Sequence, residues 1–190
     1  MKKFFIIFLL LPTIGFSRTI VNNDLLLTNF KKILNDYRWV HGLKPLEIDK
    51  NLKGFTDNWA KQMGEMGEVS HGENENTTLN RVNRYEYIKP NTHFIENCAD
   101  MITPQKNKIQ KCKMTHLDGS PWFEYEPIIP YIEGSYSGKI TQYQLAMYIF
   151  LLWKHSPSHD KGMLDRKVTH FYISSYRKGN LTYVSYIAIN

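Results

Sequence analysis

The sequence of 190 residues has little cysteine and little excess charge, and both absences limit its partners. Cys98 and Cys112 are its two cysteines, and neither has the CxxC spacing of a zinc-binding pair. The formal net charge of +6 comes without a basic helix or a basic–aromatic ladder, so we exclude nucleic acid as a partner. An anionic component of a cell envelope is compatible with this mild positive charge.

The short motifs of several enzyme classes are absent as well. The sequence contains no HExxH zinc-protease motif, no GxSxG nucleophile elbow, no P-loop and no GxGxxG fingerprint. Any catalysis would have to come from histidines and acids that are scattered along the chain. The sequence therefore favours a protein that is not an enzyme.

A long apolar run lies at the start of the chain, from Phe4 to Leu11, shortly after Lys2-Lys3. It is well short of the ~20 residues that cross a bilayer. Gly15 and Ser17 are small residues that suit a cleavage site after Ser17. This pattern predicts a signal peptide over residues 1–17, and a mature protein that is secreted or periplasmic without a transmembrane segment.

The remaining residues, 18–190, are enough for one domain with its own core. In an oxidising compartment, Cys98 and Cys112 are expected to form a disulfide, which would stabilise the fold by about 3 kcal/mol. Two free thiols are the alternative.

Helical periodicity predicts three helices in the first half of the chain. Asp24 is the expected N-cap of the first helix, and Asp49 that of the second. The expected buried face of the second helix consists of Leu52, Phe55, Thr56, Trp59 and Met63. Gly64 and Gly67 are expected to end it, and Thr78 to cap a short third helix.

The second half begins with a proline-rich stretch, residues 104–138, that has no helical period. We predict a long loop there, with one short strand near residues 122–125. Thr141 and Gln144 have the spacing of a capping box and predict a helix that runs to about residue 153. Ser156-Pro157 has the pattern of another helix start.

The last residues predict a β-hairpin. Two runs rich in β-branched and aromatic residues, 169–176 and 181–189, flank a turn that contains glycine. Helices followed by a terminal hairpin predict an α+β layer fold. Trp39, Trp59 and Trp153 fall at helical spacings, and we expect them in the core.

Short motifs across residues 29–190 follow the order typical of one secreted family. They are Asn35-x-x-Arg38 with Gly42-Leu43-Lys44-Pro45-Leu46, Trp59-Ala60-x-x-Met63, Ser70-His71, Arg81, Glu96-Asn97 and Trp153-x-x-Ser156-Pro157-Ser158-His159. Together they resemble the CAP superfamily of cysteine-rich secretory, antigen 5 and pathogenesis-related proteins, whose domain is also called the SCP domain. The last motif resembles bacterial members. The resemblance implies a CAP-like α–β–α sandwich with a C-terminal β-hairpin, formed by residues 18–190 as one domain.

The resemblance also implies a central cleft that two histidines and two acids line. His71 and His159 match the histidines, and Glu96 matches the first acid. Ser156 stands where the family has its second acid, and Asn97 belongs to the same predicted cleft. Several family members bind zinc or another divalent cation there, which implies His71 and His159 as metal ligands.

The sequence departs from the family pattern in two further places. Ile95 stands where the family has a glycine before its glutamate, and residues from about 100 to 138 form a loop-rich insertion. Together with the serine at the second acid position, these departures argue against chemistry by a pair of carboxylates.

The resemblance implies a secreted binding module for a lipid, a sterol or a partner protein, and this is the function that we expect. A metal-dependent extracellular hydrolase with His71, Glu96 and His159 as catalytic residues is the alternative, and a structural envelope protein is a third. The contrasting interpretation is a hydrogen-bonded cluster that holds helices together. His155 lies one turn before His159, but Pro157 interrupts the helix, so we do not expect His155 in the site.

Overall fold

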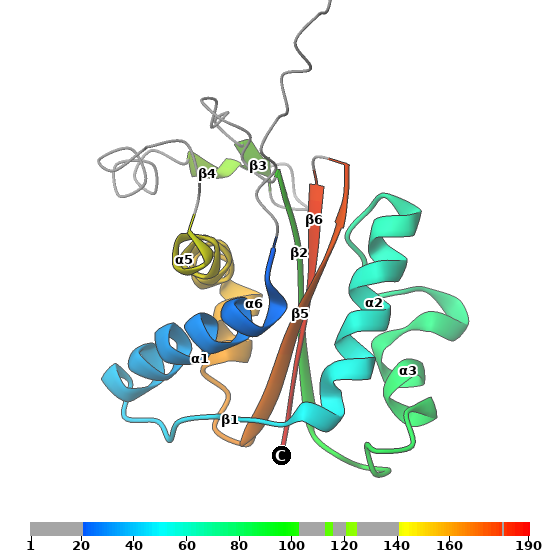
Figure 1. Cartoon of the computed structure of the whole chain (residues 1–190). Helices are drawn as coiled ribbons and strands as arrows, with labels where there is room; N and C mark the ends of the chain where they lie inside the picture. The colour runs from blue at the N-terminus through cyan, green and yellow to red at the C-terminus, as the bar shows by residue number, and fades with distance from the viewer. Residues whose placement is uncertain (1–20, 103–112, 116–120, 125–140, 180) are drawn as a thin grey trace, which may run out of the picture.

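The computed structural model describes residues 21–102, 113–115, 121–124, 141–179 and 181–190. In this part of the chain, helices cover both faces of a four-stranded sheet (Figure 1). The predicted α+β sandwich is therefore confirmed. The predicted signal peptide lies outside the described residues. Among the described helices, none is both long enough and apolar enough to cross a bilayer.

Helix α1 (Asn23–Val40) packs on one face of the sheet. Its N-cap is Asn22, whose Oδ1 accepts hydrogen bonds from the backbone N–H groups of Asp24 and Leu25. The prediction of Asp24 as the cap is wrong by two residues, because Asp24 lies in the first turn, where the helix dipole favours a carboxylate. The apolar residues buried along α1 are Leu26, Leu27, Phe30, Ile33 and Leu34.

Trp39, near the end of α1, is 79% exposed, so the prediction that it lies in the core is wrong. Trp59 and Trp153 are buried, as predicted. Trp39 is exposed because its neighbour Arg38 takes the inward position at this turn of the helix. Its guanidinium donates a 2.7 Å hydrogen bond to the Met163 carbonyl, which compensates the buried charge.

Helix α2 (Lys53–Met66) packs on the opposite face of the sheet. It follows a 3-10 turn, η1 (Lys50–Leu52), whose N-cap is Asp49, close to the predicted start. The predicted buried face is confirmed for Leu52, Phe55, Thr56, Trp59 and Met63. Gly67 ends the helix with a φ of 84°, a left-handed conformation that suits glycine.

Gly64 does not end α2, contrary to the prediction. It lies against the sheet, where a Cβ atom would come within 2.4 Å of Tyr176 Cδ1.

Next come η2 (Asn74–Asn76) and α3 (Thr78–Arg84), which lie on the same side of the sheet as α2 (Figure 1). The N-cap of α3 is Thr77, one residue before the predicted cap.

The sheet has the strand order β1-β5-β6-β2. Its strands are β1 (Glu47–Ile48), β2 (Phe94–Ile102), β5 (His170–Lys178) and β6 (Leu181–Ile189). Strands β5 and β6 pair antiparallel and confirm the predicted hairpin. Strand β2, which the sequence pattern did not predict, pairs antiparallel with β6 and carries part of the site described below.

Helices α5 (Gln142–Lys154) and α6 (Pro157–Met163) lie on the α1 side of the sheet (Figure 1). The capping box is confirmed, because the Thr141 hydroxyl accepts from the Gln144 backbone N–H and Gln144 Oε1 accepts from the Thr141 N–H. Ser156 is the N-cap of α6, as predicted, although its side chain makes no capping bond.

Two short strands lie within the predicted insertion. They are β3 (Lys113–Thr115) and β4 (Pro121–Glu124), which pair antiparallel in a separate sheet. Strand β4 overlaps the strand predicted at residues 122–125. Cys112 and most of the insertion lie outside the described residues.

Candidate binding pocket

The centre of the candidate site is Glu96 on β2, whose side chain is 2% exposed. Its Oε2 atom accepts hydrogen bonds from His71 Nδ1 at 2.9 Å, from Thr78 Oγ1 at 2.7 Å and from Arg81 Nη2 at 2.9 Å. Arg81 Nη1 lies 2.8 Å from Oε1, although this contact is too poorly aligned to be a hydrogen bond. One carboxylate therefore joins β2, α3 and the loop that carries His71.

Glu96 is ionised although it is buried. Burial raises the pKa of its carboxyl, but the hydrogen bonds from His71 and Arg81, the charge of Arg81 and the Thr78 hydrogen bond together outweigh burial. They hold the pKa of Glu96 below its usual value. The site therefore contains a permanent negative charge at neutral pH, compensated by Arg81.

We call Glu96 and its partners His71, Thr78 and Arg81 the Glu96 cluster. Arg81, on α3, makes further contacts that hold this cluster in place. Its guanidinium carbon lies 3.5 Å from the ring centroid of Trp59, in a cation–π contact. It also donates to the backbone carbonyls of Asn76 at 2.9 Å and His71 at 3.1 Å. The motif comparison identified Arg81 only as a family marker, whereas the structure shows it as the counter-ion of Glu96.

A tight turn presents His71 to the pocket. Trp59 Nε1 donates to the Ser70 carbonyl at 2.9 Å, and the Gly72 N–H donates to Ser70 Oγ at 2.8 Å. Gly72 has a φ of 82°, and a Cβ atom there would lie 1.8 Å from the Asn76 carbonyl oxygen. Only glycine fits this position, because any side chain would collide with the backbone of η2.

His159 on α6 lies close to His71, with 6.4 Å between the two ring centroids. Since the Glu96 carboxylate accepts from Nδ1 of His71, the Nε2 atom of His71 is the nitrogen left for a ligand. Burial, and then the charge of nearby His71, lower the pKa of His159 to about 4. His159 is therefore neutral at pH 7, as a metal ligand must be.

Contacts with β2 set the position of α6 and of His159. Asn97 Nδ2 donates to the His159 carbonyl at 3.3 Å. A Cβ atom at Gly162 would lie 2.6 Å from Ile95 Cγ2 and 3.2 Å from Asn97 Oδ1. Ile95, which stands where the family has a glycine, therefore packs directly against the backbone of α6.

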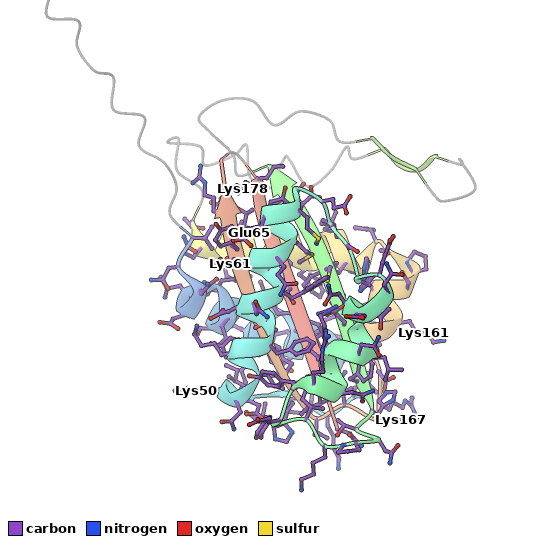
Figure 2. The ribbon with its side chains drawn as sticks, turned by 90° about the vertical axis from the view of Figure 1, so that its right-hand side faces the viewer. Lys50, Lys61, Glu65, Lys161, Lys167 and Lys178 are labelled. Carbon is purple, nitrogen blue, oxygen red and sulfur yellow. The ribbon has the colours of Figure 1, made fainter. Side chains whose placement is uncertain are left out.

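A pocket of about 280 Å³ lies among these residues. The predicted cleft residues that line it are His71, Glu96, Asn97 and His159. The predicted Ser156 is not among the described residues that line it. Ser158 is, and its hydroxyl lies 3.4 Å from that of Ser156. Lys161 also contributes to the lining and extends outward from α6 (Figure 2).

Cys98 is a neighbour of the site that the motif comparison missed. Metal-ligating atoms of His71, Glu96 and Cys98 all lie within 4.8 Å of one another. The signal was in the sequence, because residues two apart on a strand share a face, as Glu96 and Cys98 do on β2. Burial, and then the charge of Glu96, raise the pKa of the Cys98 thiol well above its usual value, so in the reduced protein the thiol is protonated at neutral pH.

The Cys98–Cys112 disulfide stays a prediction. Cys98 is a buried free thiol in the described part of the chain, and Cys112 lies outside it. Non-reducing peptide mapping of protein from an oxidising compartment is expected to give one linked species, which reduction separates into two peptides. Recovery of both cysteines as alkylated free thiols, without prior reduction, would contradict the prediction.

Solved structures with this fold include bacterial extracellular proteins. An outer surface protein from Borrelia burgdorferi matches with a TM-score of 0.59 and 13% identity, over 90% of this chain and 96% of that one. An extracellular SCP-domain protein from Bacillus anthracis matches with a TM-score of 0.58 and 15% identity, over 88% of this chain and 41% of that one. A cysteine-rich secretory protein from Staphylococcus aureus matches with a TM-score of 0.50 and 14% identity, over 88% of this chain and 39% of that one. At these identities the similarity establishes the fold.

The family follows from the sequence itself. The model of the CAP family, the cysteine-rich secretory protein family, matches residues 32–189. The chain therefore belongs to the CAP family, as its ordered motifs predict. No curated protein sequence matches the chain at a significant level.

Proposed function

We propose that this CAP protein is an extracellular binding protein whose pocket holds a divalent cation, such as zinc, between His71 and His159. The cation would in turn bind a small polar ligand. The observation that carries the proposal is the pair of imidazoles on one pocket, 6.4 Å apart between ring centroids. The extracellular location rests on the signal peptide predicted at residues 1–17 and on the extracellular proteins that share the fold.

The described residues fit such a cation. His159 is neutral at pH 7, and a carboxylate behind His71 is a common outer-shell partner of a metal-binding histidine. Glu96 is engaged by Arg81, so we assign it to orienting His71 rather than to binding the cation. Cys98 is close enough to contribute a ligand, but binding would have to release a thiol proton whose pKa burial raises, so we assign the cation to the two histidines.

Zinc is expected to stabilise the folded protein, because a ligand that binds only the native state adds stability by mass action. At a zinc concentration of 100 Kd, the gain is about 2.7 kcal/mol, or roughly 5–10 °C in Tm for a chain of this size. The measurement is a melting curve at pH 7 with and without zinc. His71→Ala and His159→Ala are expected to abolish the shift.

His155→Ala is the matched control, since it removes a histidine four residues from His159 that does not line the pocket. It is expected to respond to zinc as the wild type does. If His159→Ala and the wild type shift equally, the pocket is not the metal site, and the hydrogen-bonded cluster is the better interpretation.

Hydrolysis is the second candidate function, and one observation favours it. A cation held by the two imidazoles of His71 and His159 would have coordination positions left for water, and Glu96 fixes the orientation of His71. A bound cation would supply an acidified water molecule. Ester hydrolysis by the zinc-loaded protein that His71→Gln and chelation both abolish would support this function. Hydrolysis that His71→Gln leaves unchanged would exclude a cation held by His71 as the catalyst.

Lipid or sterol binding is a finer form of the binding function that family membership suggests. Phe94 and Ile95 add apolar surface to the pocket, whereas most of its other lining residues are polar or ionisable. This lining supports a polar ligand better than a sterol. If a fatty acid competed with zinc for the pocket of the wild-type protein, that result would favour a lipid over a polar ligand.

A further inference from the structure

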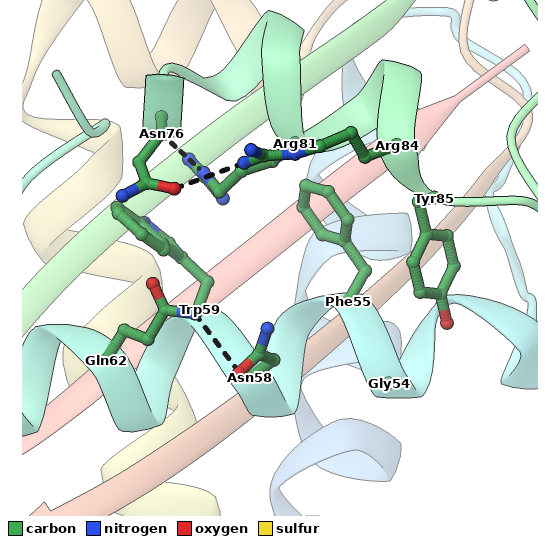
Figure 3. Close-up of a pocket in the computed structure, with 9 residues that line it drawn as sticks. All are labelled: Gly54, Phe55, Asn58, Trp59, Gln62, Asn76, Arg81, Arg84 and Tyr85. Carbon is green, nitrogen blue, oxygen red and sulfur yellow. Dashed lines mark hydrogen bonds between the residues drawn. The ribbon is translucent and has the colours of Figure 1, made fainter. Parts of the chain in front are cut away.

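A second pocket lies between α2 and α3, and Figure 3 shows its lining residues. We call it the α2–α3 pocket, and its volume is about 180 Å³. The side chains that matter for its chemistry are Phe55, Asn58, Gln62, Asn76, Arg84 and Tyr85. Arg81 belongs both to its wall and to the Glu96 cluster, but His71 and His159 do not line it.

Arg84 gives the α2–α3 pocket an uncompensated positive charge. Its Nη2 atom donates to Asn76 Oδ1 at 3.1 Å, and it forms no ion pair with any residue in the described part of the chain. The described lining contains no carboxylate, and the charge of Arg81 is already compensated by Glu96. A guanidinium has five N–H donors, so Arg84 has donors left for a ligand.

The amide side chains add further donors. Asn76 Oδ1 accepts from Arg84, which leaves the Asn76 Nδ2 group to donate. Asn58 Oδ1 accepts from Gln62 Nε2 at 3.2 Å, and the Asn58 amide nitrogen points into the space between the helices (Figure 3). The pocket therefore offers mainly donors and a positive charge, which suits an anionic ligand with several acceptors.

Two fixed aromatic rings form the apolar side of the pocket. Phe55 and Tyr85 pack edge to face, with 5.6 Å between ring centroids. The Tyr85 hydroxyl donates to the Asn51 carbonyl at 2.7 Å, which fixes the ring. A Cβ atom at Gly54 would lie 2.9 Å from the Tyr85 hydroxyl oxygen, so glycine leaves room for this arrangement.

We propose that the α2–α3 pocket binds a small organic carboxylate. The carboxylate pairs with Arg84, because the planar guanidinium fork matches the two carboxylate oxygens. The Asn58 and Asn76 amides donate to the same group, and the body of the ligand lies against Phe55 and Tyr85. This site is separate from the His71–His159 pocket and does not depend on a cation there.

The test uses benzoate as the probe, because it joins a planar carboxylate to a flat apolar ring. In a ¹H–¹⁵N NMR titration of the mature protein, the backbone amides of Asn58, Asn76 and Arg84 are expected to shift. For so small a ligand we expect a Kd on the order of 1 mM. Benzamide, the uncharged analogue, is expected to bind at least about tenfold more weakly, because it cannot form the ion pair.

Arg84→Gln is expected to weaken benzoate binding at least about tenfold, and Asn58→Leu to weaken it less. Arg166→Gln, which replaces an exposed arginine outside the pocket, is expected to bind benzoate as the wild type does. His159→Ala is also expected to keep wild-type affinity, which distinguishes this site from the proposed cation site. Equal binding of benzoate and benzamide, or equal affinity in Arg84→Gln and the wild type, would overturn the proposal.

Discussion

Arg81→Met is expected to lower the free energy of unfolding by about 3–5 kcal/mol, because it leaves the buried Glu96 carboxylate without its counter-ion. The same change removes the cation–π contact with Trp59 and the hydrogen bond to the His71 carbonyl. Urea denaturation followed by circular dichroism at pH 7 measures the loss. Arg84→Met, three residues along the same helix, is the matched control and is expected to change stability by less than about 1 kcal/mol.

A double variant separates the loss of the charge pair from a general loss of packing. In Arg81→Met/Glu96→Gln the buried carboxylate at position 96 is removed as well, so the double variant is expected to be more stable than Arg81→Met alone. A double variant that is less stable than Arg81→Met would show that the ion pair is not the main contribution of Arg81.

Acid is expected to destabilise the metal-free protein partly through His159. The pKa of His159 is about 4 in the folded state, against about 6.5 in an unfolded chain. Between these values the unfolded state binds more protons, so stability is highest above pH 6.5 and falls as the pH drops towards 4. The contribution of His159 to this loss is about 3 kcal/mol.

Urea denaturation at several pH values between 7 and 4, in the presence of a chelator, measures the effect. His159→Gln is expected to lose less stability than the wild type over this range, because glutamine does not titrate. His41→Gln, at an exposed site at the end of α1, is expected to follow the wild type. Parallel pH profiles for His159→Gln and the wild type would contradict the buried, neutral state of His159.

Local signals predicted the elements whose ends depend on nearby residues. The capping box at Thr141 and Gln144 and the terminal hairpin are examples, because their hydrogen bonds join residues close in sequence. Strand β2 was not predicted because Glu96, Asn97 and Asp100 interrupt its apolar pattern. It is a strand because it pairs with β6, which lies far along the chain.

The convergence of His71, Glu96 and His159 was predictable only from the order of family motifs, since no local pattern links three separate segments. The charge balance of the site depends on Arg81, and no spacing rule connects a residue of α3 to a strand. The exposure of Trp39 was also not predictable from a local spacing rule. Helical spacing alone did not show that Arg38 would occupy the inward position.

The tight turn at Gly72 also bears on how strongly the pocket can bind. Its backbone sits so close to η2 that position 72 accepts no side chain, and this leaves little freedom for the loop that carries His71. The Glu96 carboxylate then restricts rotation of the imidazole itself. The orientation of the His71 ring is already set before a ligand binds, so the protein loses little conformational entropy on binding. Gly72, which has no side chain, fixes the loop, and Glu96 fixes the ring, so the two together preorganise this pocket.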